Sequence, residues 1–302
     1  MQPRVLDDAV RRQLRYVAAN GVRELSRFPD FLIVGPQRTG TTWLHANLRY
    51  HPQIFLAEPK ELFFFSRLKT PEHPKFQSND LGWYLRFFRD PLWRRLAKTG
   101  ICLWQSRALY RPRVRGEATA SYAVLDRDVI AEITTLNPGI KVILMIRDPI
   151  ERAWSHAKKD LVRNRGRKLA DVTAREFQEF FAHPYQRRCA GYVECCDNWT
   201  ANLRNGHLLV CFFDDIALRP EALLLEVLTF LGVEAQPRYL GPEVREAVNP
   251  TPASKIPGPY RRFLEELLQP EIEQLKERFG VSWPLGAHPL VLRLPERAVD
   301  TE

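Results

Sequence analysis

Four short apolar runs alternate with longer amphipathic segments along the chain. The runs are FLIVG (31–35), IFLA (54–57), KVILMI (141–146) and HLLVCFF (207–213). Uninterrupted apolar runs of this length are typical of strands buried on both faces. Because segments with helical periodicity separate them, the pattern predicts an α/β fold, a single domain in which helices flank a central parallel sheet.

Start and stop signals place two of the helices. After the third apolar run, Asp148 can cap a helix, Pro149 occupies its first position and Glu151 completes a capping box. After the fourth run, RPEALLLEVLTFLGV (219–233) has an amphipathic pattern that Gly232 closes. Residues 41–50 have the same helical spacing directly after the first run.

The remaining segments suggest how the domain is organised. Residues 1–27 form a basic, amphipathic helical lead-in, and residues 28–302 form the main domain. Within it, residues 62–115 are rich in Trp, Phe and Arg, which favours an insertion on the substrate side. A proline-rich stretch, NPTPASKIPGP, precedes C-terminal helices expected at about 258–280.

Charge indicates an anionic partner. The 302 residues contain 45 Lys and Arg against 36 Asp and Glu, a formal net charge of +9. A polyanion, a lipid surface or a phosphorylated small molecule fits this surplus, as does a basic surface that is simply solvated. The arginine clusters lack interleaved aromatic residues, so we expect no nucleic acid partner.

The cysteines and the apolar segments bear on the compartment. Five cysteines, an odd number without metal-type spacing, fit a reduced cytoplasmic setting and no metal site. The first 20 residues carry charges throughout and lack a signal-peptide core, and no apolar run is long enough to span a membrane.

The loop GPQRTGTT (35–42) follows the first predicted strand. Gly35 and Gly40 have the spacing of a phosphate-binding P-loop, but Thr41 stands where the pattern requires lysine. Backbone N–H groups at the start of the next helix favour an anion, and Arg38 supplies a cation from within the loop. The sequence therefore predicts a phosphate or sulfate site here.

A second anion site is predicted at the end of the third strand. Arg147 follows that strand, and Ser155 lies about two helical turns into the next helix. Since the carboxyl ends of parallel strands share one crevice, the two anion sites can hold the two ends of one ligand. An ordinary ion pair of Arg147 with Asp148 is the alternative.

Carboxylates are the candidate proton acceptors. Glu58 and Glu61 flank Lys60 just before an apolar run, and Glu117 lies in RGEATASY. Burial of such a carboxylate favours a general base, although a solvated loop glutamate is the alternative. Histidine and cysteine spacing indicates neither a zinc site nor a serine hydrolase.

Together, PQRTGTTWL, KELFFFS and ILMIRDPIERAWSHAKKD resemble sulfotransferases that use 3′-phosphoadenosine 5′-phosphosulfate (PAPS). The resemblance runs from about Phe31 to Gly232 and is strongest to carbohydrate (heparan-type) and bacterial members. It implies a P-loop NTPase-like sulfotransferase fold. It also implies transfer of a sulfuryl group to an acceptor hydroxyl, with adenosine 3′,5′-bisphosphate as product. GEATASY matches a further motif except that Ala118 replaces its lysine.

The resemblance also implies roles for individual residues. Glu61 is the catalytic base, and Arg38 occupies the position of a catalytic lysine. Trp43 stacks on adenine, and Phe213 stands at a position where some members contact adenine. Residues implied to bind the cofactor are Arg38, Thr39, Gly40, Thr41, Thr42, Trp43, Arg147, Ser155 and, more weakly, Lys255.

Two other functions remain open on the residues alone. One is a P-loop kinase or nucleotidase, with Asp214 after the fourth strand holding Mg²⁺. The other is a non-enzymatic protein that binds polyanions through its arginines. For the enzyme, the arginine excess suits an acidic sugar or polysaccharide as acceptor, while an aromatic pocket suits a lipid or polyketide alcohol. The sequence does not indicate the oligomeric state.

Overall fold

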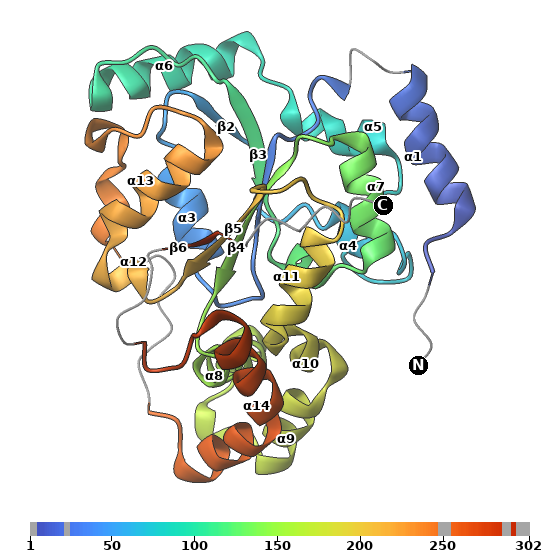
Figure 1. The fold of residues 1–302 in the computed structure, drawn as a ribbon, viewed down its shortest axis with the longest axis vertical. Coiled ribbons are helices and arrows are strands. Elements are labelled where there is room, and N and C mark those ends of the chain that lie inside the picture. Colours follow the sequence, from blue (N-terminus) through green and yellow to red (C-terminus); the bar gives the residue numbers. More distant parts are fainter. Residues whose placement is uncertain (1–4, 21–24, 247–254, 286–290, 294–302) are drawn as a thin grey trace, which may run out of the picture.

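A six-stranded sheet forms the centre of the computed structural model, which describes residues 5–20, 25–246, 255–285 and 291–293 (Figure 1). Its order is β2-β3-β1-β4-β5-β6; β1 to β5 are parallel, and β6 pairs antiparallel with β5. This confirms the predicted α/β fold. The strands are β1 (Phe31–Val34), β2 (Ile54–Leu56), β3 (Val114–Ala118), β4 (Lys141–Ile146), β5 (Leu208–Phe212) and β6 (Val291–Arg293).

Two strands were not predicted. β3 contains Arg115, Gly116 and Glu117, so its pattern is not apolar. It nevertheless lies inside the sheet between β2 and β1. Gly116 is needed there, since a Cβ atom would approach the Phe31 ring to 2.3 Å. β6, only three residues long, lies at the edge of the sheet.

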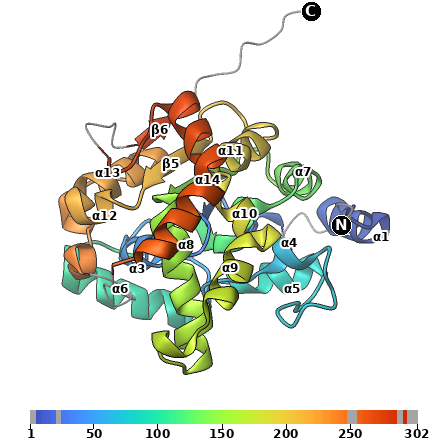
Figure 2. The ribbon, with the colours of Figure 1, turned by 90° about the horizontal axis from the view of Figure 1, so that it is seen from below.

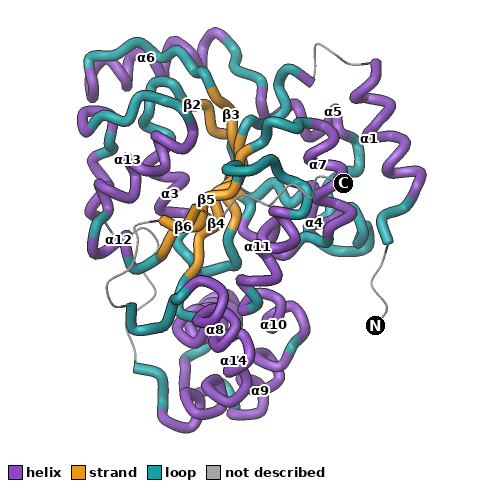
Figure 3. The backbone as a smooth tube through the Cα atoms, viewed as in Figure 1, coloured by secondary structure: helices purple, strands orange, loops and turns teal. Residues whose placement is uncertain are grey.

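Alternate side chains of the strands pack in two separate hydrophobic cores, one on each face of the sheet. Leu32, Val142 and Leu144 face a core that includes α7 (Arg127–Leu136) and α11 (Tyr192–Thr200). Their neighbours in sequence face α3 and α13 on the other side of the sheet. Figures 1 and 3 show these two helical layers on either side of the strands. The helices of the second layer are α3 (Thr41–Leu48), α12 (Asp215–Leu218) and α13 (Pro220–Leu231).

A third group of helices lies beyond the carboxyl end of β4 (Figure 1). It comprises α8 (Pro149–Ala157), α9 (Ala174–Ala182), α10 (Pro184–Ala190) and α14 (Gly258–Phe279). Where the sequence predicted more than one C-terminal helix, the structure has the single helix α14, which continues through Pro270. Leu264 and Leu268 before the proline and Leu275 after it are all buried, so packing on both sides of Pro270 holds the helix together.

The N-terminal helix and the 62–115 segment both pack against the first core. α1 (Asp8–Asn20) lies in the predicted lead-in and contacts α5 (Leu81–Leu85) and α7. Phe64 and Phe65 of α4 (Phe64–Arg67) and Tyr84 of α5 are buried in that core. The part around α6 (Leu92–Ser106) and residues 71–80 are largely exposed. None of the helices in the described ranges has the length and apolarity that crossing a bilayer requires.

Candidate functional site

The loop between β1 and α3 has the shape of an anion cradle. Gly35 and Gly40 adopt φ values of 154° and 96°. A Cβ atom on Gly35 would lie 2.6 Å from the Thr39 Oγ1 atom, and one on Gly40 would lie 2.4 Å from the Ile216 Cδ1 atom. α3 begins at Gly40 without a side-chain cap and without an acidic residue in its first turn. Its first amides therefore remain able to bind an anion.

The hydroxyl groups of this loop have different surroundings. Thr39 is fully buried, and its hydroxyl donates to the Pro36 carbonyl at 2.8 Å, so this side chain fixes the turn. Thr41 is buried and Thr42 is half-buried at the first two positions of α3. The structure thus places Thr41 and Thr42 at the helix N-terminus, where the sequence predicted anion ligands.

Arg38, Ser155 and Arg147 meet although they are far apart in the sequence. The Arg38 Nε atom donates to the Ser155 Oγ atom at 3.0 Å. The Arg147 Nη1 atom donates to the Arg38 carbonyl oxygen at 3.2 Å. The two predicted anion sites therefore form one continuous site at the carboxyl ends of β1 and β4.

Positive charge is concentrated in this site. Burial, together with the Arg147 and Arg163 guanidinium groups, lowers the pKa of Arg38. Burial also lowers the pKa of Arg147, whose guanidinium carbon lies 4.2 Å from the centre of the Phe213 ring. Burial and both of these arginines lower the pKa of Lys158. A bound anion would relieve this repulsion, so the electrostatics favour a ligand with more than one negative group.

Three contacts fix the end of β4 and the start of α8, on either side of Arg147. Asp148 caps α8 as predicted, because its carboxylate accepts from the Ile150 and Glu151 amides, but Glu151 does not complete the predicted capping box. The Glu151 carboxylate pairs with Arg261 of α14 at 3.0 Å, and this ion pair connects α8 to α14. The Arg147 amide donates to the Tyr192 hydroxyl at 3.3 Å, which fixes the exit from β4.

Glu61 lies in an unusual backbone conformation. Its φ is 70°, and that of Phe63 is 57°; such values are uncommon for residues with a side chain. The Glu61 amide donates to the Ala118 carbonyl at 2.9 Å, and its carboxylate pairs with Lys60 at 2.8 Å. Strained backbone of this kind is concentrated at functional sites.

Lys159 is within electrostatic range of both Glu61 and Arg38. Burial lowers the pKa of Lys159; the Asp160 and Glu61 carboxylates oppose this shift, and Arg38 adds to it. It lies in a π-helical turn, Lys158–Val162, that continues α8 after Ser155. Lys159 was not among the residues predicted from the sequence, although the pair of lysines in SHAKKD is a visible signal. π-Helical turns inside helices are frequent at functional sites.

Glu117 is connected by hydrogen bonds to the loop that carries Glu61. It is buried, and its carboxylate accepts from the Tyr84 hydroxyl and, at 2.7 Å, from the Thr119 hydroxyl. The Thr119 Oγ1 atom in turn accepts from the Leu62 amide at 3.1 Å. Burial raises the pKa of Glu117 to about 7, while the hydrogen bonds oppose the shift and Glu61 adds to it. Glu117 has no route to solvent, so it positions the loop.

Replacing Glu117 with glutamine is expected to flatten the dependence of stability on pH. Because folding raises this pKa from its ordinary value of 4.5, its contribution is full below pH 4.5 and is lost as pH rises through about 7. The loss amounts to about 3 kcal/mol. Urea unfolding at pH 4.5, 6 and 7.5 measures it, with the exposed Glu265→Gln as control. An unchanged slope in E117Q would contradict the assignment.

Two predicted cofactor contacts lie elsewhere. Trp43 is 2% exposed, packs in the second core and donates from its indole nitrogen to the Val244 carbonyl at 3.2 Å. The structure therefore gives Trp43 a packing role instead of an open face for adenine. Lys255 is exposed just before α14, and no contact of the described residues joins it to Arg147 or Ser155.

Gln37 and Tyr185 form a further contact that the sequence did not indicate. The Tyr185 hydroxyl lies 2.6 Å from the Gln37 Nε2 atom and 2.9 Å from its Oε1 atom. Tyr185 belongs to α10, so this contact attaches the phosphate loop to the third helical group. A single tyrosine carries no signal in the sequence that would have revealed this contact.

The residues on which the kinase alternative depends have other partners. Asp214 accepts from the Trp283 indole nitrogen at 3.2 Å, and the buried Asp215 pairs with Arg219 at 2.7 Å. Among the described residues, no group of three or more His, Cys, Asp or Glu side chains is arranged to hold a metal ion.

Comparisons with known proteins agree on one family. The sulfotransferase domain model matches residues 28–249. The membrane-associated sulfotransferase kil1 of Dictyostelium discoideum is 30% identical over 127 residues, which is 42% of this chain and 22% of that protein. Human bifunctional heparan sulfate N-deacetylase/N-sulfotransferase 2 is 28% identical over 221 residues, covering 68% of this chain and 22% of that enzyme. This chain thus spans about a fifth of the length of these relatives.

A solved structure shares the fold. The crystal structure of a sulfotransferase from Alicyclobacillus acidocaldarius aligns over 83% of this chain and 95% of its own, with a TM-score of 0.55 and 22% sequence identity. At this identity the likeness bears on the fold alone.

Proposed function

This chain belongs to the sulfotransferase family, and we propose that it transfers the sulfuryl group of PAPS to a hydroxyl group of a carbohydrate. The observation that carries the proposal is the contact of Arg38 with Ser155 and Arg147. It joins a P-loop-like cradle to a second cationic centre, an arrangement suited to a nucleotide with phosphate groups at both ends.

The residues present fit such a cofactor. The two glycines leave space that a Cβ atom would fill, and the uncapped start of α3 offers amides for the 5′ end. Arg147 and Ser155 would hold the 3′-phosphate through charge-assisted hydrogen bonds. When bound, PAPS supplies the sulfuryl group that is transferred.

The chain itself would position the acceptor and remove its proton. In this proposal Glu61 accepts the proton of the acceptor hydroxyl, and Lys60, at 2.8 Å, orients its carboxylate. Arg38 and Lys159 stabilise negative charge that develops during transfer. Arg38 remains charged throughout, so it acts by electrostatics and supplies no proton.

The charges around Glu61 support an acidic sugar as the acceptor. Lys60 pairs with the carboxylate at 2.8 Å, and the Lys75 ammonium lies 4.4 Å from the centre of the Phe63 ring, two residues along the chain. This basic and aromatic surrounding suits an acidic sugar. The curated relative that acts on heparan sulfate, a sugar polymer, supports the same class.

Calorimetry with adenosine 3′,5′-bisphosphate, ATP and AMP tests the donor. We expect the 3′,5′-bisphosphate to bind at least tenfold more tightly than AMP, because only it reaches both cationic centres. Tighter binding of ATP that depends on Mg²⁺ would indicate a kinase. Strong binding of heparin without binding of any nucleotide would indicate a polyanion-binding protein. Transfer from labelled PAPS to acidic and neutral sugars then tests the acceptor.

A further inference from the structure

Apolar side chains are exposed on and just after α6. Within the described residues, seven of the ten exposed large hydrophobic side chains lie between residues 92 and 109. Trp93 is 71% exposed and Trp104 84% exposed. At 100° per residue, Leu92, Leu96 and Leu103 fall with both tryptophans on one stripe of the helix. The seven are Leu92, Trp93, Leu96, Ile101, Leu103, Trp104 and Leu109.

The polar stripe of α6 is the one that packs against the protein. The Arg94 guanidinium lies 4.4 Å from the centre of the Phe55 ring and donates to the Leu56 carbonyl at 2.8 Å. Lys98 donates to the carbonyl of Arg49, the residue that ends α3, at 3.2 Å. Because the polar face of α6 packs against the protein, its apolar face is exposed and available to bind another surface. Figures 1 and 2 both show α6 at the periphery of the molecule.

Basic residues surround this apolar stripe. The segment from Leu92 to Gly116 contains no aspartate or glutamate. Four of its arginines are exposed: Arg95, Arg107, Arg111 and Arg113. The tryptophan, leucine and arginine content is that of helices that lie in the interface of an anionic bilayer. Two copies of this chain packed through α6 would instead bring two basic surfaces together.

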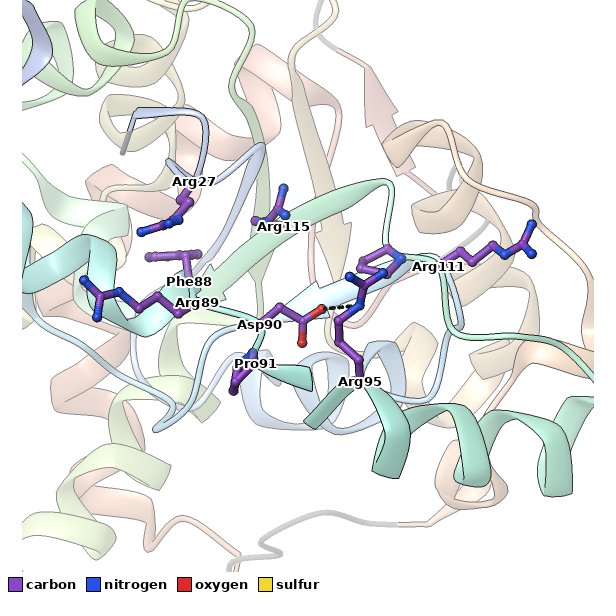
Figure 4. Close-up of a pocket in the computed structure, with 9 residues that line it drawn as sticks. Arg27, Phe88, Arg89, Asp90, Pro91, Arg95, Arg111 and Arg115 are labelled. Atoms are coloured by element: carbon purple, nitrogen blue, oxygen red, sulfur yellow. Dashed lines mark ion pairs between the residues drawn. The ribbon is translucent and has the colours of Figure 1, made fainter. Parts of the chain in front are cut away.

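A pocket of about 530 Å³ adjoins the start of α6 (Figure 4). Five arginines line it, and Asp90 is its one acidic residue. The Asp90 side chain is 9% exposed and lies 3.7 Å from Arg95, and its Oδ1 atom is buried without a hydrogen-bond partner. The arginines are Arg27, Arg89, Arg95, Arg111 and Arg115.

This pocket is separate from the candidate active site. Arg27 precedes β1, and the Arg115 amide near the start of β3 donates to the Asp30 carboxylate at 2.7 Å. The pocket therefore lies at the amino ends of parallel strands whose carboxyl ends carry the phosphate loop. The phosphate loop precedes the first residue of α3 and α6 lies near its last residue, so the length of α3, about 12 Å, separates them.

We infer that α6 and the adjoining arginine pocket form a docking surface for a bilayer that contains anionic phospholipids. The leucine and tryptophan side chains enter the interfacial region of the bilayer, and the pocket receives the phosphate of a lipid headgroup. Arg107, which caps the end of α6, pairs with a neighbouring headgroup. This docking leaves the phosphate loop at the far end of α3, open to water-soluble ligands.

Vesicle flotation tests the inference with the intact chain. The protein is expected to float with vesicles of phosphatidylglycerol and phosphatidylcholine and much less with phosphatidylcholine alone, and salt should weaken the binding. W93D/W104D should reduce partitioning at least tenfold. Arg89→Gln with Arg111→Gln should reduce it by about fivefold per charge.

Matched variants separate docking from folding. Leu218→Asp is the apolar control, because Leu218 is 66% exposed on α12, and Arg175→Gln is the charge control, because the Arg175 side chain is 86% exposed on α9. Both should float like the parent protein, and all variants should keep its circular dichroism. Equal flotation of W93D/W104D and parent would overturn the inference. The inference would also be overturned if the protein did not bind vesicles but formed a dimer in analytical ultracentrifugation, and if W93D/W104D dissociated that dimer. Neither outcome bears on the proposed reaction, since no donor is present.

Discussion

Replacing Glu61 with glutamine is expected to lower kcat for sulfuryl transfer by about 10²–10⁴-fold while binding of adenosine 3′,5′-bisphosphate stays near the parent value. Glutamine keeps the size of the side chain and a hydrogen-bond acceptor for Lys60, but it takes up no proton. Single-turnover transfer from labelled PAPS, together with calorimetry of the product nucleotide, measures the two quantities.

Glu58→Gln is the matched control for this experiment. Glu58 is exposed and belongs to the same loop, three residues before Glu61. The Glu58→Gln substitution removes one negative charge from the same loop, as Glu61→Gln does, so a general electrostatic effect would lower turnover in both variants. Near-normal turnover in E61Q, or equal losses in the two variants, would contradict the role of Glu61 as base.

The backbone around Glu61 adds to this argument. A left-handed φ at Glu61 and at Phe63 costs energy that a glycine would avoid. The surroundings maintain it through the Glu61 amide to Ala118 and the Leu62 amide to Thr119. Thr119 is itself held by Glu117, so a buried carboxylate orients an accessible one. This arrangement is consistent with the different roles proposed for the two glutamates.

Hydrophobic pattern was sufficient to predict most of the sheet. Strands β1, β2, β4 and β5 are buried along their length, so each appears in the sequence as an apolar run. β3 escaped prediction because its central positions carry Gly116 and Glu117, whose places in the sheet depend on Phe31 and Tyr84 from distant segments. Such tertiary contacts leave no local periodicity.

The site was predictable where it depends on strand ends and less so where it depends on packing. Arg38, Arg147 and Ser155 follow from the topology of parallel strands, and the structure brings them into contact. Trp43 differs because its large ring faces a core that includes α13, which only the three-dimensional structure reveals. Lys159 was missed because a π-helical turn changes the face on which it lies.

Replacing Arg147 with alanine is expected to weaken the binding of adenosine 3′,5′-bisphosphate by about 10–100-fold and the binding of AMP far less. The reason is that a hydrogen bond to a charged group contributes about 1.5–3 kcal/mol. The variant also loses the bond to the Arg38 carbonyl, and any loosening of the loop lowers affinity for both nucleotides. Their affinity ratio, measured by calorimetry, therefore isolates the 3′-phosphate. Arg261→Ala, which removes the ion pair with Glu151, controls for displacement of α8. Equal losses for both nucleotides in R147A would assign Arg147 to the loop alone.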